Sequence, residues 1–137
     1  MKKGDAALIV LMVAACCFLS HVKADEIFIA GFTNKPFSRT SCFGEENKGN
    51  KVVGLSGSTW DDIGAECGKK LRVICMGPVS PDQTKDCNLS SSTYVDVIVV
   101  NRCEDCEDGT MKLSKDAFEE IAYEEAHRVK VQYVWVP

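Results

Sequence analysis

The sequence of 137 residues has no run of basic residues, no internal repeat and no low-complexity tract. Its 16 Lys+Arg are outnumbered by 20 Asp+Glu, which gives a formal net charge of −4. Because binding to a phosphate backbone relies on clustered cations, we expect no nucleic-acid partner. Only two histidines are present, and the one C-x-x-C pair has no second pair to complete a structural zinc site. We therefore expect neither a metal nor another cofactor.

One long apolar stretch is present, and it lies at the amino terminus. Ala6–Leu19 follows a positively charged start and precedes small residues at the −3 and −1 positions of a cleavage site before Asp25. This arrangement is typical of a secretory signal peptide and is too short for a membrane anchor. Val13–Cys16 also resembles a bacterial lipoprotein box, but the apolar run continues past it. We predict a signal peptide over residues 1–24 and one secreted domain over residues 25–137.

Removal of residues 1–24 leaves 113 residues, enough for a single modest core. Three lysines and one aspartate are lost, so 13 Lys+Arg face 19 Asp+Glu and the net charge becomes −6. Six cysteines remain, and an even number in a small secreted domain indicates a disulfide framework. Fifteen connectivities are open to six cysteines, and sequence alone does not choose among them. We predict the sequential pairing Cys42–Cys67, Cys75–Cys87 and Cys103–Cys106.

Hydrophobic patterns predict a mainly β fold. The run 91–103 is rich in β-branched residues on both faces, as in a closed barrel or a parallel pairing. We expect further strands over 25–32, 52–55, 69–76 and 129–136. One short helix should start at the capping box of Ser58 and end at Gly68, with Gly64 marking a close approach by another segment. A second helix should be capped by Ser114. Short strands with two short helices predict a β-rich barrel with helical insertions.

Several residues could serve recognition. Trp60, Tyr94, Tyr133 and Trp135 could form a stacking platform for sugars, although such residues more often pack in a core. Asn88-Leu89-Ser90 is an N-glycosylation sequon in a predicted loop. His127, the one histidine outside the signal peptide, stands next to the last strand and is expected at the surface.

The pair Cys103-x-x-Cys106 has the spacing of thiol oxidoreductases. A reactive cysteine needs electropositive surroundings that stabilise its thiolate. Here four carboxylates surround the pair and Arg102 is the one nearby cation. We therefore interpret the pair as a structural bridge that closes a turn.

Five segments of the sequence resemble a known family, and the order and spacing of all six cysteines are part of this resemblance. They are Ser41–Gly44, Gly64–Cys75, Val99–Cys103, Leu113–Phe118 and Val129–Tyr133. The chain resembles the secreted expansin-like domain proteins over nearly all of Glu26–Tyr133. It is most similar to the plant natriuretic peptide-like, or blight-associated, group. The carboxyl half matches better than the start, where Phe32-Thr33 replaces an aromatic pair.

This resemblance implies a six-stranded double-psi β-barrel and an extracellular, apoplastic location. Hydrolysis of a polysaccharide needs two carboxyl groups across the scissile bond. By resemblance, the acidic positions of catalytic relatives correspond to Lys112 and Asn101, and neither residue can act as the missing acid or base near neutral pH. Asp61 and Asp62 are explained by their place at the start of a helix, and the acidic loop around Glu104 by solvation.

We therefore predict a secreted, non-catalytic, monomeric protein that acts by binding. Its groove should contain Trp60, Asp61, Asn101 and Lys112. The resemblance favours a signalling role in water and ion balance or stress, with an extracellular receptor as partner. The alternative is a protein that binds or loosens cell-wall polysaccharide, with weak or no hydrolase activity. We expect no association with the membrane after the signal peptide is cleaved.

Overall fold

The computed structural model describes residues 26–137, so the predicted signal peptide lies outside the described residues. Six strands make up most of the fold: β1 (Phe28–Thr33), β2 (Val52–Ser56), β3 (Lys70–Pro78), β4 (Tyr94–Cys103), β5 (Thr110–Ser114) and β6 (Val129–Trp135). Two short helices and one 3₁₀ turn connect them: α2 (Gly57–Ile63), α3 (Lys115–Ile121) and η1 (Glu124–Ala126). The predicted mainly β fold with short helical insertions is confirmed.

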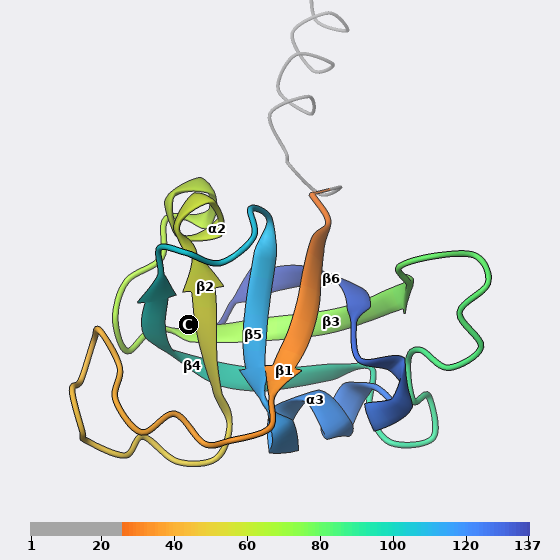
Figure 1. Ribbon diagram of the computed structural model, residues 1–137, viewed down its shortest axis with the longest axis horizontal. Helices are drawn as coiled ribbons and strands as arrows, with labels where there is room; N and C mark the ends of the chain where they lie inside the picture. Colours follow the sequence, from red (N-terminus) through yellow and green to blue (C-terminus); the bar gives the residue numbers. More distant parts are fainter. Residues whose placement is uncertain (1–25) are drawn as a thin grey trace, which may run out of the picture.

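The strands close into a barrel in the order β1-β5-β2-β4-β3-β6. Two neighbouring pairs, β1 with β5 and β2 with β4, are parallel, and the other four pairs are antiparallel. Strands β2, β5 and β1 stand side by side at the front of Figure 1, whereas β3 and β6 cross behind them. Closure leaves no free sheet edge, which removes a common site of unwanted strand pairing.

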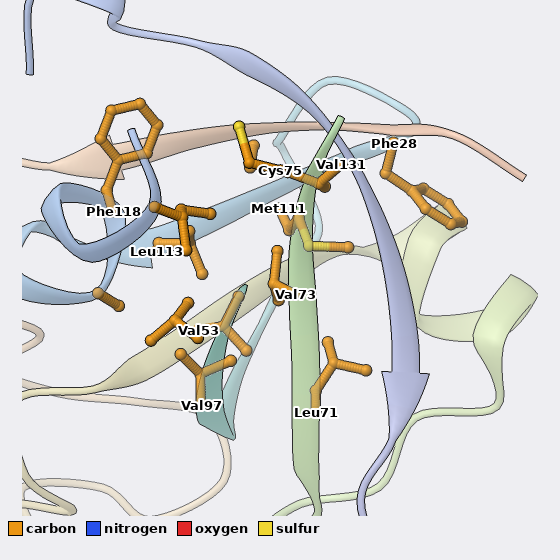
Figure 2. Packing of buried hydrophobic residues seen from close by; sticks show 14 of the residues in the cluster. Phe28, Val53, Leu71, Val73, Cys75, Val97, Met111, Leu113, Phe118 and Val131 are labelled. Atoms are coloured by element: carbon orange, nitrogen blue, oxygen red, sulfur yellow. The ribbon is translucent and has the colours of Figure 1, made fainter. Parts of the chain in front are cut away.

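The interior is filled by branched aliphatic side chains that alternate along the strands. On β4 the inward residues are Val95, Val97 and Val99, each at most 2 % exposed. The inward residues Leu71, Val73 and Cys75 of β3 are buried. Figure 2 shows Val97 and the three β3 side chains in one cluster with Val53, Met111, Leu113 and Val131 from the other strands. Helix α3 covers one end of the core with Ala117, Phe118 and Ile121, whereas α2 lies at the opposite end (Figure 1).

The boundaries of α2 differ from the expected ones. Ser56, and not Ser58, is the N-cap, because its hydroxyl accepts the amide hydrogen of Thr59. The helix ends at Gly64, which has a left-handed backbone (φ 65°), so Gly64 is a C-cap residue and not a point of close approach. Ser58 instead accepts a hydrogen bond from the Gly109 amide. Ser56 and Ser58 could each cap a helix, and Gly64 and Gly68 could each end one. Because β2 ends at Ser56, the helix starts directly after it and ends at Gly64.

Helix α3 begins after Ser114 as predicted, but the Ser114 side chain does not cap it. Its hydroxyl donates to the carbonyl of Asn50 and accepts from the amide of Val52, 62 residues away in the sequence. It therefore anchors the start of β2.

Three disulfides join Cys42 to Cys67, Cys75 to Cys87 and Cys103 to Cys106, which is the sequential pairing. Within residues 26–137, no helix has the length and apolarity needed to span a lipid bilayer.

Candidate functional site

Four residues from four adjacent strands form a row across the outer face of the barrel. Gly54 on β2 is the register partner of both Asn101 on β4 and Lys112 on β5. Lys112 in turn is the partner of Gly31 on β1. The row therefore reads Asn101–Gly54–Lys112–Gly31, and the two residues with side chains alternate with two glycines. This arrangement places Asn101 and Lys112 on one surface, although they come from different strands.

An open groove of about 510 Å³ lies over the Lys112 side of this row, a volume in the range typical of ligand sites. Its floor consists of β1, β5 and β2, and its two rims come from the β4–β5 loop and from the turn that precedes β6. The lining residues include Gly31, Gly54, Ser56, Asp105, Glu107, Lys112, His127 and Arg128. Lys112 is the exposed cationic side chain on the floor.

Asn101 lies on the other side of Gly54 and has a structural contact. Its Oδ1 accepts a hydrogen bond of 2.8 Å from the Ser41 amide, which ties the β1–β2 loop to β4. The ring of Phe37, from the same loop, covers Gly54 so closely that a Cβ there would stand 3.3 Å from the ring. Neither Asn101 nor Phe37 lines the groove over Lys112.

One rim of the groove is the acidic loop between β4 and β5. It carries the Cys103–Cys106 disulfide together with Asp105 and Glu107, whose side chains are both exposed. The Cys103 Sγ lies 3.2 Å from Asp105 Oδ1, but a disulfide sulfur has no hydrogen to donate. Cys103, Asp105 and Cys106 also lie close enough to hold a cation, yet both sulfurs are bonded to each other and cannot act as thiolate ligands.

The facing rim is a turn of unusual backbone geometry. His127 has φ 61° and ψ −40°, and the Arg128 amide donates to the Ala126 carbonyl at 2.7 Å. These values describe a γ-turn with a positive central φ, a rare and strained form. The side chain of Gln83 holds the turn: its Nε2 donates to the Arg128 carbonyl at 2.9 Å and to the Ala126 carbonyl at 3.4 Å. The strain is therefore maintained by a long-range contact from the β3–β4 loop.

Two residues predicted for the groove, Trp60 and Asp61, lie outside its lining on α2. Asp61 forms a bidentate ion pair with Arg102, with contacts of 2.8 and 3.3 Å. Arg102 also pairs with Glu104 and lies over the Trp60 ring at 5.9 Å. The hydrogen bond from Arg102 lowers the pKa of the Asp61 carboxyl. The hydrogen bonds to Asp61 and, to a smaller extent, to Glu104 raise the pKa of Arg102. This cluster joins α2 to the end of β4.

The aromatic residues considered as a sugar platform are dispersed. Trp60, Tyr133 and Trp135 pack against the core, and the Trp135 indole donates to the Ile63 carbonyl. Burial raises the pKa of the Tyr133 hydroxyl. Tyr94 is 42 % exposed on the outer face of β4, where the Arg72 guanidinium stacks on its ring at 4.2 Å. None of these four rings lines the groove over Lys112.

A second hollow of about 770 Å³ lies beneath the β1–β2 loop and beside the start of α3. Its charged groups are largely paired within the protein. Lys48 pairs with Glu46, Lys115 pairs with Glu124, and Asp116 accepts a hydrogen bond from Asn50.

The sequon residue Asn88 is half-buried, and its Oδ1 accepts a hydrogen bond from Ser90. The intervening Leu89 is 77 % exposed. Glycosylation at Asn88 stays a prediction.

Sequence reasoning found Lys112 but missed Gln83, Arg128 and the conformation of His127. No sequence signal marks the positive φ of His127, because non-glycine residues as a class rarely adopt such a conformation. Gln83 stands in a loop without periodicity, and its role depends on a contact made 45 residues later.

Comparisons with known proteins agree with this architecture. Residues 52–133 match the double-psi β-barrel family model described as "Lytic transglycolase". An EG45-like domain containing protein from Citrus jambhiri is 30 % identical over 133 residues, which is 97 % of this chain and 98 % of that protein. EG45-like domain containing protein 2 from Arabidopsis thaliana is 29 % identical over the same share of both chains.

Among solved structures, a mutant expansin of Clavibacter michiganensis in complex with cellohexaose superposes with a TM-score of 0.56 at 20 % identity. The match covers 82 % of this chain and 50 % of the expansin, so the chain spans about half the length of that protein. At this identity the likeness concerns the fold. With the closed six-stranded barrel, the family match and the full-length relatives, the chain belongs to the double-psi β-barrel family as an expansin-like, EG45-like domain protein.

Proposed function

We propose that this protein acts outside the cell by binding cell-wall polysaccharide in the groove over Lys112, without cleaving it. The observation that carries the proposal is the groove floor, where Lys112 stands between Gly31 and Gly54. Lys112 is exposed on this floor, and the two rims provide hydrogen-bonding groups on both sides of it. Export by a signal peptide over residues 1–24 is part of the proposal.

The distribution of carboxylates supports binding over hydrolysis. Glycoside hydrolysis requires one carboxyl group on each side of the scissile bond. Within the described lining, the carboxylates are Asp105 and Glu107, and both belong to the same rim. The facing rim carries His127 and Arg128, and the floor carries an amine. A sugar chain in this groove would meet acids on one side only.

The test combines binding with product release. The secreted protein is incubated with insoluble cellulose, xylan and chitin, and the bound fraction and the reducing ends are measured together. We expect retention on at least one polysaccharide and no reducing ends above the blank. Release that disappears in Asp105→Asn or Glu107→Gln would show a hydrolase and refute the proposal.

A signalling role in water and ion balance is the competing function. The same experiment separates it, because a receptor ligand should bind plant cells saturably and ignore all three insoluble polysaccharides. Saturable cell binding that survives enzymatic removal of wall polysaccharide would favour signalling.

A further inference from the structure

The groove has two cationic residues next to the same glycine, Gly31. Lys112 is the direct strand neighbour of Gly31. Arg128 passes over the same glycine, because its Cγ would lie 3.8 Å from a Cβ placed on Gly31. Both side chains therefore flank one position where the floor has no side chain of its own.

These two cations are weakly neutralised by the protein. Among the described residues, Lys112 has no carboxylate within ion-pairing distance. Arg128 faces Glu107 at 3.6 Å, and both side chains are exposed, 47 % and 74 % respectively. A separation of 3.6 Å is too long for a good hydrogen bond. Solvent-exposed pairs of this kind contribute little energy. A ligand carboxylate could therefore replace Glu107 on Arg128 with a shorter, bidentate contact.

The position of Arg128 is imposed by the fold. The strained γ-turn at His127 directs the chain over Gly31, where the His127 carbonyl would lie 3.6 Å from a Cβ. Gln83 holds this turn with hydrogen bonds to carbonyls on both sides of it. Strained backbone persists where the surrounding structure stabilises it, and it concentrates at binding sites.

The opposite face of the barrel offers a contrast within the same chain. There Arg72 is bonded to Asp96 by contacts of 2.8 and 3.1 Å and is stacked on Tyr94. Asp96 therefore binds the Arg72 guanidinium through two short contacts. Neither Lys112 nor Arg128 has such a contact with a carboxylate of the described residues.

We infer that the groove selects acidic polysaccharides, and that Lys112 and Arg128 together bind the carboxylate of a uronic acid residue above Gly31. This inference rests on the proposed function and names the class of glycan. Gln83 is a positioning residue that holds Arg128 in place.

Binding is measured by calorimetry at low salt with three soluble probes: hexagalacturonate, its carboxyl-reduced hexagalactose counterpart, and cellohexaose. We expect hexagalacturonate to bind at least about tenfold more tightly than the reduced form, because charge-assisted hydrogen bonds are the strong ones. Lys112→Gln and Arg128→Gln should each remove most of this preference. Lys70→Gln, which removes the same charge from an exposed site on β3, should leave it unchanged.

Glu107→Gln provides a test in the opposite direction. Removal of this competing carboxylate should strengthen the binding of hexagalacturonate without affecting cellohexaose. Gln83→Ala should weaken hexagalacturonate binding while the affinity for neutral probes stays the same. A merely structural role of Gln83 would lower both.

The outcomes separate the two proposals. Equal binding of the acidic and reduced hexamers overturns the inference and leaves non-cleaving glycan binding intact. A preference that survives in the Lys112→Gln/Arg128→Gln double variant overturns the assignment to these residues. Failure of all three probes, and of insoluble cellulose, xylan and chitin, refutes the proposed function as well.

Discussion

The two helices of the barrel look alike in sequence but are held by different forces. Each has seven residues and follows a serine with nearly the same backbone, φ −60° and ψ 156° at Ser56 against φ −60° and ψ 153° at Ser114. The Ser56 hydroxyl caps its helix, whereas the Ser114 hydroxyl binds a segment 62 residues away. The same residue in the same conformation therefore performs two different tasks.

Burial accounts for the rest of the difference. Helix α3 places Ala117, Phe118 and Ile121 in the core, each fully buried. Helix α2 buries Ile63 and Thr59 and presents Trp60 half-exposed beneath Arg102. We expect α3 to depend on apolar packing and α2 on hydrogen bonds, charge and the nearby Cys42–Cys67 disulfide. Four predictions test this contrast.

The largest effect should come from Phe118→Ala on α3. Phe118 is fully buried and stacks against Phe32 with ring centroids 4.8 Å apart. Loss of a buried phenylalanine side chain costs about 3–5 kcal/mol of the free energy of unfolding. Trp60→Ala on α2 is the matched control and should cost less, although its ring is larger. Urea denaturation measures both, and a greater loss for Trp60→Ala would contradict the contrast.

Removal of the Cys42–Cys67 disulfide should rank second. The double variant Cys42→Ser/Cys67→Ser opens a loop of 25 residues, which is worth about 3.5 kcal/mol of denatured-state entropy at room temperature. Hydrogen exchange should show faster opening of α2 and of the β1–β2 loop, with α3 still protected.

The matched variant Cys103→Ser/Cys106→Ser opens a much shorter loop, with a separation of three residues, and should cost less. If the Cys42→Ser/Cys67→Ser variant lost equal protection at α2 and α3, the Cys42–Cys67 disulfide would not act locally.

Ser56→Ala should have the third effect. Loss of an N-cap hydroxyl costs about 1 kcal/mol. Ser58→Ala removes the serine that the sequence favoured as the cap, and it should cost less because the Ser58 hydroxyl accepts from Gly109 and not from the first turn of α2. Thermal unfolding of the two variants side by side measures the difference, and the reverse order would place the cap at Ser58.

The smallest effect concerns pH. Arg102 holds the pKa of Asp61 below its ordinary value of 3.8, so the folded state stabilises the ionised carboxylate. Its contribution to stability is therefore present above the unfolded pKa and is lost as the pH falls through the lowered folded pKa. The melting temperature of Asp61→Asn should lie slightly below that of the wild type at neutral pH, and the two should converge in acid.

Asp62→Asn is the control, because it removes an adjacent carboxylate that is not paired with Arg102. If the gap between wild type and Asp61→Asn stays constant down to strong acid, the ion pair contributes nothing to the fold.

The residues predicted for the groove and those that line it agree only in part. Lys112 was identified through the family resemblance, and it does line the groove. The resemblance predicts Trp60 and Asp61 in the same groove, but they line neither that groove nor the second hollow. A short helix gives no sequence signal for the direction in which it leaves the barrel, so the positions of its side chains relative to β5 could not be derived. No sequence pattern distinguishes Arg128, which stands just before the last strand.

Local patterns in the amino-acid sequence are enough to predict the strands and a disulfide framework, because alternation of side chains and local composition act over a few residues. The tertiary structure decided which serine caps a helix and which residues share the groove. Those outcomes depend on strand register, which the packing of many distant side chains sets together. Gly31, Gly54, Lys112 and Arg128 lie far apart in the chain, and only the closed barrel brings them to one surface.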